Sequence, residues 1–177
     1  MQYFAELRRA MAILAEHPRA IFLGQAVACA GTAMTASFDG VPKAKLLELP
    51  VFEDTQMGIS IGLALDGSLP ISVYPRWNFL ICAANQLVNH LDKLPLYSGF
   101  RPQVIVRVAV PTPEPLDPGP QHLGNFSDAF RQMCKTVRIV ELTDAEMIVP
   151  AYKEAAARAG ATILVEFTEK YNHGTRD

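Results

Sequence analysis

The sequence lacks the features of several large protein classes. Its 177 residues contain no run of Lys and Arg, and the formal net charge is −2. Because nucleic-acid binding depends on clustered basic residues that displace counterions, we expect no nucleic-acid partner. No apolar run is long enough to cross a bilayer, and the N-terminal segment is amphipathic rather than an apolar signal block. The sequence therefore predicts a cytoplasmic protein with no membrane partner.

Cysteine is also scarce, and its placement argues against a metal or disulfide framework. Cys29, Cys82 and Cys134 are widely spaced, and the sequence has no CxxC pattern. We therefore expect no metal site on this chain. All three cysteines have apolar neighbours in the sequence, which predicts reduced thiols in the core.

The common catalytic and nucleotide-binding motifs are missing as well. The chain has no GxGxxG, no P-loop, no GxSxG elbow and no HExxH. Without a glycine-rich phosphate loop, an unrelated Rossmann-type nucleotide-binding protein is not favoured.

What remains is the composition and pattern of an α/β domain. Half of the residues are hydrophobic, so one domain over residues 1–177 can build a core. Apolar runs of strand length alternate with helical periods. The predicted strands are 20–23, 70–74, 104–110, 137–142 and 162–167, and the predicted helices are 2–16, 58–65, 78–93, 125–134 and 144–160. This alternation predicts a single doubly wound, mostly parallel sheet with helices on both faces.

Candidate site residues are ambiguous when they are taken one at a time. Glu53 precedes the predicted helix 58–65, where a carboxylate is favoured by the helix dipole. His122 follows a loop over 111–120 in which five of ten residues are proline, and a loop histidine is usually solvated. Asn78 is predicted to cap the helix 78–93, and Phe79 by itself indicates a core side chain.

Taken together, however, short motifs occur in the order seen in a known family. They are Pro50-Val51-Phe52-Glu53 followed by Gly58-Ile59-Ser60-Ile61-Gly62, then Asn78-Phe79-Leu80, Tyr97-Ser98-Gly99, Gly119-Pro120-Gln121-His122 and Leu164-Val165-Glu166. Each motif alone is weak, but their shared order over nearly the whole chain is specific. The sequence thus resembles the pyrimidine-binding domain of thiamine-diphosphate enzymes. In particular, it resembles the N-terminal half of the beta subunit in the decarboxylating component of 2-oxo acid dehydrogenases, a transketolase-like domain.

The resemblance implies a thiamine-diphosphate-binding fold of the pyrimidine type and a role for each matched residue. Glu53 would hydrogen-bond the aminopyrimidine ring and favour the tautomer that deprotonates the thiazolium carbon. Phe79 would stack on the pyrimidine face. Gln56 is assigned to the cofactor-binding residues, and His122 would stabilise or protonate oxygen atoms during catalysis.

Departures from the family pattern shape the expected assembly. Gln25 stands where the family usually has Glu, and Tyr74-Pro75-Arg76-Trp77 replaces a stretch near the substrate pocket. The Gly-Asp-Gly…Asn motif that binds the diphosphate through Mg²⁺ is missing. We expect neither a diphosphate-binding domain nor a C-terminal transketolase domain. A partner alpha-type subunit would supply that motif, in a homodimer or heterotetramer that uses the helix 78–93.

Two functions remain open at this point. The first is a subunit of a split enzyme that decarboxylates a 2-oxo acid and transfers the resulting acyl or aldehyde unit, oxidatively or by carboligation. The second is a non-catalytic assembly or regulatory subunit derived from a pyrimidine-binding domain. Glu53 favours the enzyme, because a subunit without catalysis would tolerate its loss.

Overall fold

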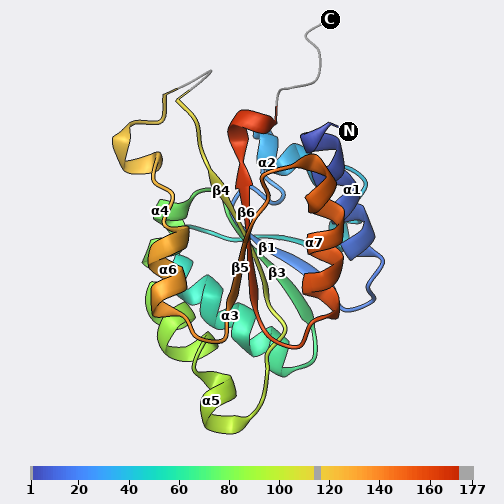
Figure 1. Ribbon diagram of the computed structural model, residues 1–177. Coiled ribbons are helices and arrows are strands. Elements are labelled where there is room, and N and C mark those ends of the chain that lie inside the picture. Colours follow the sequence, from blue (N-terminus) through green and yellow to red (C-terminus); the bar gives the residue numbers. More distant parts are fainter. Residues whose placement is uncertain (1, 114–116, 172–177) are drawn as a thin grey trace, which may run out of the picture.

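The computed structural model describes residues 2–113 and 117–171, and a parallel sheet runs through its centre (Figure 1). The sheet has six strands in the order β2-β1-β3-β4-β6-β5, and every neighbouring pair is parallel. The strands are β1 (Ala20–Gly24), β2 (Leu46–Glu48), β3 (Leu69–Tyr74), β4 (Ile105–Val110), β5 (Arg138–Glu141) and β6 (Thr162–Phe167). Parallel strands are covered on both faces, which explains why the central ones are nearly continuous apolar runs.

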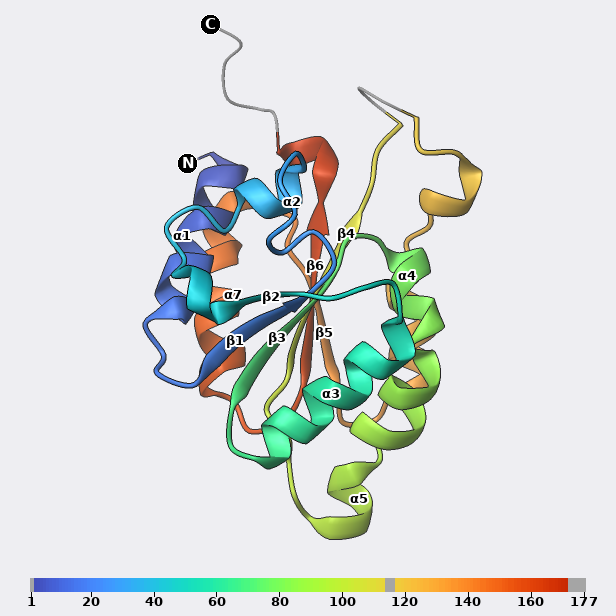
Figure 2. The same cartoon turned by 180° about the vertical axis from the view of Figure 1, so that it is seen from behind.

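Helices cover both faces of the sheet (Figures 1 and 2). One face packs against α1 (Tyr3–Ala15), α2 (Ala33–Ala36) and α7 (Ala145–Ala157). The other packs against α3 (Glu53–Leu65), α4 (Trp77–Cys82), the π-helix η2 (Gln86–Leu91) and α6 (Ser127–Met133). The short helix α5 (Leu94–Ser98) follows η2, and 3₁₀ turns occupy Lys43–Lys45, Pro120–His122 and Thr168–Lys170. The predicted α/β fold with helices on both faces is confirmed, and the sheet is parallel throughout.

Several boundaries differ from the sequence prediction. Helix α3 begins at Glu53 rather than at residue 58, because Glu53 and Asp54 supply the acidic first turn that favours a helix start. The predicted helix 78–93 is interrupted: α4 ends at Cys82, and η2 continues with π-type hydrogen bonds. Periodicity alone does not reveal a π insertion, since the apolar residues before and after it still face the sheet.

The prediction of buried cysteines is wrong for two of the three. Cys29 and Cys82 are exposed, whereas Cys134 is buried. Cys82 lies on the outer side of α4, and Cys29 lies in the loop after β1. Apolar neighbours in the sequence do not fix the side of a helix or loop on which a residue lies.

None of the helices within residues 2–113 and 117–171 is long and apolar enough to cross a membrane.

Candidate functional site

The candidate site residues gather at the carboxyl ends of the strands. Gln25 directly follows β1, α4 follows β3, and His122 comes after β4 in the chain. Parallel strands end at the same edge of a sheet, and this edge is where open α/β folds bind ligands. The structure therefore brings Glu53, Phe79 and His122 to one edge.

Glu53 is a nearly buried carboxylate at the N-terminal end of α3. The residue is only 7% exposed, and its Oε1 accepts a hydrogen bond of 2.9 Å from Nε2 of Gln25. Its backbone carbonyl accepts a 3.1 Å hydrogen bond from the hydroxyl of Tyr74, whose pKa is raised by burial. Within the described residues, Oε2 accepts no hydrogen bond. Glu53 thus keeps one carboxylate oxygen for a ligand, while the helix N-terminus favours its negative charge.

Gly24 sets how closely α3 approaches the sheet beneath Glu53. A Cβ atom at this position would lie 2.2 Å from the carbonyl oxygen of Val73 and 2.8 Å from Nε2 of Gln56. The φ angle of Gly24 is +139°, a conformation that disfavours side chains. Only glycine therefore allows β1, β3 and Gln56 to meet here.

Gln56 lies under the site rather than on its surface. It is fully buried, and its Nε2 donates to the carbonyl of Val73 at 3.0 Å and to Oγ of Ser72 at 3.1 Å. Its Oε1 is buried without a hydrogen-bond partner in the described residues. These contacts hold α3 against β3, and direct contact between Gln56 and a cofactor stays a prediction.

Phe79 and His122 form the other half of the site. Their ring centroids are 5.9 Å apart and tilted by 43°, and both side chains are half-buried. Nδ1 of His122 lies 3.0 Å from Oδ1 of Asn78, and its Nε2 lies 3.1 Å from Nε2 of Gln121. Asn78 does not cap α4 as predicted, because the helix already begins at Trp77. Its side chain is directed to His122 instead.

The loop that carries Gln25 is held by a further carboxylate. Glu48, at the end of β2, accepts hydrogen bonds of 2.6 to 3.1 Å from four consecutive backbone N–H groups, those of residues 26–29. Ala26 has a φ of +58°, which turns these N–H groups toward one point. Glu48 therefore fixes the start of the loop next to Gln25.

Sequence reasoning missed the positioning roles of Gln25, Asn78 and Glu48. The sequence contained one signal for Gln25, a polar side chain directly after a buried strand. Nothing in the sequence pointed to the partners of Asn78 and Glu48, because both contacts join segments far apart in the chain. No group of three or more His, Cys, Asp and Glu side chains in residues 2–113 and 117–171 is arranged to hold a metal ion.

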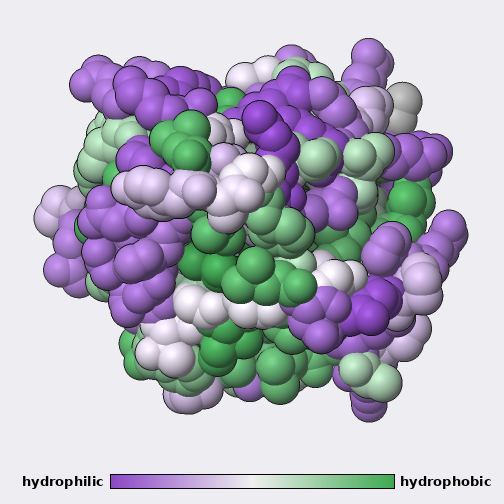
Figure 3. All heavy atoms as spheres, turned by 90° about the horizontal axis from the view of Figure 1, so that it is seen from below, coloured by the Kyte–Doolittle hydropathy of each residue, from purple (hydrophilic) through white to green (hydrophobic). Residues whose placement is uncertain are grey.

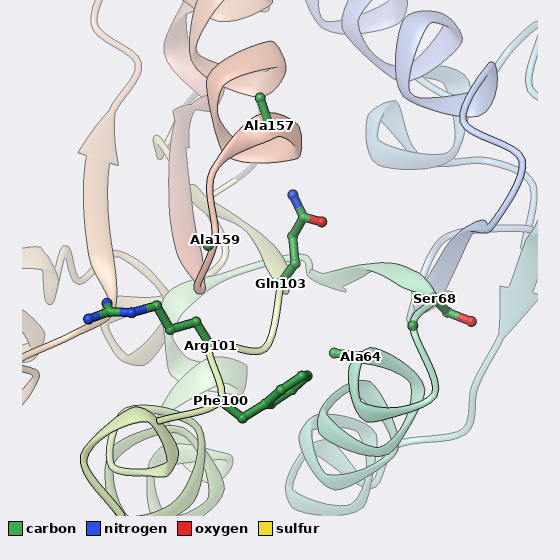
Figure 4. A pocket seen from close by; sticks show the side chains of 8 residues that line it. Ala64, Ser68, Phe100, Arg101, Gln103, Ala157 and Ala159 are labelled. Atoms are coloured by element: carbon green, nitrogen blue, oxygen red, sulfur yellow. The ribbon is translucent and has the colours of Figure 1, made fainter. Parts of the chain in front are cut away.

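Two hollows lie away from the candidate site. One of about 320 Å³ is at the amino ends of the strands. Figure 4 shows Phe100, Arg101 and Gln103 lining it beside small side chains. Another, of about 310 Å³, lies between α3 and the η2–α5 segment. Its lining residues are Gly58, Ile61, Leu65, Gln86, Asn89, His90, Leu94 and Tyr97.

Comparison with known proteins gives relatives in both sequence and fold. No family model matches the chain. The pyruvate dehydrogenase E1 component subunit beta of Gracilaria tenuistipitata var. liui is 27% identical over 128 residues, which cover 72% of this chain and 39% of that protein. A solved structure described as a split gene transketolase, inactive beta4 tetramer, matches with a TM-score of 0.72 and 16% identity.

The extent of these matches is unequal. The solved structure covers 94% of this chain, whereas this chain covers 50% of the solved one. The chain thus spans half or less of the length of the proteins it matches. The six-stranded parallel sheet and its helices thus have the fold of this split transketolase chain, and the sequence is similar to that of an E1 beta subunit.

Proposed function

We propose that this chain is the pyrimidine-binding and activating subunit of a split thiamine-diphosphate enzyme. The observation that carries the proposal is Glu53, a nearly buried carboxylate at the carboxyl edge with one oxygen left for a ligand. The names of the relatives support the same reading, since one is a pyruvate dehydrogenase subunit and the other a transketolase. The substrate class that we propose is a 2-oxo acid, which is decarboxylated before transfer of the acyl or aldehyde unit.

The residues present fit the aminopyrimidine half of the cofactor. Oε2 of Glu53 would accept a hydrogen bond from the ring nitrogen opposite the amino group, and Gln25 would keep the carboxylate in place through Oε1. The half-buried Phe79 would offer its ring face to the pyrimidine. When bound, the cofactor supplies a carbon nucleophile and an electron sink for the decarboxylated substrate.

His122 would handle protons on the substrate side of the site. Its ring lies 5.9 Å from that of Phe79, so a molecule against the Phe79 ring would also meet the histidine. Imidazole exchanges protons near neutral pH, which suits groups that gain and lose a proton within one turnover. The diphosphate and its Mg²⁺ are assigned to a partner, since the chain lacks the Gly-Asp-Gly motif.

For contact with a second copy of the chain we propose, in place of the predicted helix 78–93 alone, the outer face of α3 together with the η2–α5 segment beside it. Gly58 and Gly62 lie inside this helix, and a Cβ atom at either would meet nothing within 4 Å. Helix-interior glycine costs about 1 kcal/mol relative to alanine, and no packing contact within residues 2–113 and 117–171 requires it here. A helix from another copy could approach closely at these glycines.

Apolar side chains continue this surface toward α5. Leu65 is 54% exposed and Tyr97 81% exposed, and both line the hollow between α3 and α5. Figure 3 shows hydrophobic surface on the face seen from below, where α5 lies. The proposed assembly is tested by Gly58→Leu, which should convert a dimer into a monomer in sedimentation velocity. A wild-type chain that stays monomeric at high micromolar concentration would contradict the assembly.

The proposed function is tested by reconstitution with a subunit that carries the Gly-Asp-Gly motif. The mixture should decarboxylate pyruvate or a related 2-oxo acid, whereas this chain alone should not. Glu53→Gln should lower the rate by about 10²- to 10⁴-fold, because cofactor activation loses its proton relay. Asp54→Asn, a change of the exposed neighbouring carboxylate, should leave the rate within about twofold.

The same experiment separates the enzyme from the alternative function. Full activity of the Glu53→Gln complex would show that the carboxylate is not used. A stable complex with no turnover of any 2-oxo acid or ketose would favour a non-catalytic assembly or regulatory subunit.

A further inference from the structure

The His122 ring lies between two amide side chains that present different atoms to it. On one side, Nδ1 is 3.0 Å from the carbonyl oxygen Oδ1 of Asn78. On the other side, Nε2 is 3.1 Å from the amide nitrogen Nε2 of Gln121. An amide oxygen can only accept a hydrogen bond here, and an amide nitrogen can only donate one.

This arrangement is satisfied by one form of the ring. If Nδ1 carries the proton, it donates to Asn78 and leaves Nε2 as an acceptor for Gln121. In the opposite tautomer, the Nδ1 lone pair would face the Asn78 oxygen and an N–H group would face another N–H group. In a doubly protonated ring, the Nε2–H group would still face the N–H group of Gln121. With the two amides in these orientations, both contacts are favourable only in the neutral ring protonated at Nδ1.

We propose that Asn78 is a positioning residue that fixes His122 in this tautomer, so that Nε2 enters catalysis as a proton acceptor. The proposal deepens the function proposed above and rests on it for the role of Nε2. The group that His122 recognises first is then a hydroxyl of the substrate or of the species formed from it. A bare carbonyl oxygen would need a donor that neutral Nε2 does not provide.

The surroundings of the ring support this assignment of roles. Asn78 is half-buried in the first turn of α4, so the helix backbone fixes the point from which its side chain reaches His122. Gln121 is exposed on the 3₁₀ turn, and a substrate hydroxyl can replace its amide as the donor to Nε2. The tilted ring of Phe79 packs against His122 and limits its rotation. Asn78 thus sets the tautomer, and Gln121 occupies the position that the substrate hydroxyl would take.

The proton balance of the step is simple. The hydroxyl O–H bond breaks, its electron pair stays on the oxygen as an alkoxide, and the proton forms an Nε2–H bond, which makes the ring a cation that still donates from Nδ1 to Asn78. The proton then leaves from Nε2 to water at the exposed side of the ring. Asn78 would hold the ring through both states, since its oxygen accepts from Nδ1 in each.

The tautomer can be measured without any cofactor or partner. Histidine labelled with ¹⁵N in the free chain reports which ring nitrogen carries the proton, at a pH about two units above the ordinary histidine value. His122→Gln identifies the signals among the four histidines. The expected result is a protonated Nδ1 and an unprotonated Nε2. A ring protonated mainly at Nε2 would overturn the proposal.

Substitution of Asn78 tests the cause. Asn78→Leu should change the ratio of the two tautomers by about fivefold toward Nε2–H, since one hydrogen bond is lost. Asn89→Leu makes the same side-chain change on η2 and should leave the ratio unaltered. If Asn78→Leu does not fold, Asn78→Asp keeps the acceptor and should retain the Nδ1–H form. An unchanged ratio in folded Asn78→Leu would overturn the role of Asn78.

In the reconstituted enzyme, Asn78→Leu should lower kcat by about tenfold with little change in KM. The free-chain measurement keeps this proposal separate from the proposed function. The expected tautomer without any turnover would count against the function and leave the tautomer assignment standing. Full turnover with the opposite tautomer would count against the tautomer assignment and leave the proposed function standing.

Discussion

Two buried glutamates in this molecule show how a structural carboxylate differs from one available for chemistry. Glu166 on β6 is fully buried, and Arg107 donates to both of its oxygens. The hydroxyls of Tyr152 and Tyr171 donate to the same two oxygens at 2.7 and 2.6 Å. Glu53 is almost as buried, but its carboxylate accepts only one hydrogen bond in the described part of the chain.

Glu166, Arg107, Tyr152 and Tyr171 form one hydrogen-bonded cluster, and two further contacts of Arg107 complete it. Its third guanidinium nitrogen donates to Oγ of Ser37 at 2.7 Å, and the group lies 5.0 Å from the centre of the Phe38 ring. Burial and the nearby Glu166 charge raise the pKa of Tyr152 well above its ordinary value, so this phenol stays a donor. We call the cluster around Glu166 closed because both of its carboxylate oxygens already accept hydrogen bonds from inside the protein, whereas Glu53 keeps one oxygen for a ligand. Burial alone therefore does not mark a functional carboxylate; unused hydrogen-bonding capacity does.

The largest effect on stability should come from opening the closed cluster. Arg107→Met leaves Glu166 buried without its cation, so the free energy of unfolding should fall by about 3 to 5 kcal/mol. Urea denaturation measures this change. Arg107→Met with Glu166→Leu should recover part of the loss, because no charge is then left unpaired. A loss below about 1 kcal/mol in the single variant would mean that the cluster is not a closed unit.

Asp92 offers a second closed carboxylate, with a smaller expected effect. It is fully buried, and its oxygens accept from the backbone N–H groups of Lys135, Thr136 and Val137 and from the Lys93 ammonium. Asp92→Asn should lower the free energy of unfolding by about 2 to 3 kcal/mol at neutral pH, because charge-assisted hydrogen bonds are lost.

The same variant has a defined pH dependence. Burial by itself would raise the pKa of Asp92, but the hydrogen bonds from Lys93 and the three backbone N–H groups outweigh it and lower the pKa below the ordinary 3.8. The stabilisation by the carboxylate is therefore complete above 3.8 and is lost as the pH falls through the lower folded-state value. The difference between wild type and Asp92→Asn should shrink in acid. A constant difference would assign the effect to packing.

Glu53→Gln should affect activity strongly and stability little, in contrast to the substitutions of Arg107 and Asp92. The substitution should change the free energy of unfolding by less than about 1 kcal/mol, because the carboxylate makes few contacts, while cofactor-dependent activity is lost. Urea denaturation of the free chain, next to Arg107→Met, gives the comparison directly. A destabilisation as large as that of Arg107→Met would place Glu53 among the structural carboxylates.

The smallest effect separates the three thiols without changing the fold. Cys29 and Cys82 are exposed and should react readily with a thiol reagent, whereas Cys134 is buried. Burial, reinforced by the charge of Asp92, raises the pKa of Cys134 to about 12, so its reactive thiolate is rare at neutral pH. Two fast equivalents and one slow one are expected in a labelling time course. Asp92→Asn should speed the slow one, because it loosens the neighbouring contacts.

The sequence was sufficient for the fold class, a parallel sheet with helices on both faces, because alternating apolar runs and helical periods allow few arrangements; it predicted neither the strand order nor β2. It also placed Glu53, Phe79 and His122 on segments that parallel strands bring to one edge. It failed where a side chain's partner is distant in the chain. Asn78 was expected to cap its own helix, yet its partner is His122, 44 residues away. The π-helix was missed because the apolar residues before and after it still face the sheet. The exposure of Cys82 was missed because local patterns do not determine which side of a helix is covered.

Gly24 has a consequence for which sequences this fold can accept. A single added carbon would collide with the Val73 carbonyl, which is backbone and cannot rotate away. In a library of every substitution, this position should therefore tolerate no replacement, while Gly58 and Gly62, which face open space, should accept alanine in the isolated chain. A selection for folding alone and a selection for the assembled enzyme should then both reject every substitution of Gly24. At Gly58 and Gly62, the first selection should accept alanine and the second should reject it. That disagreement would map the contact surface without a structure of the complex.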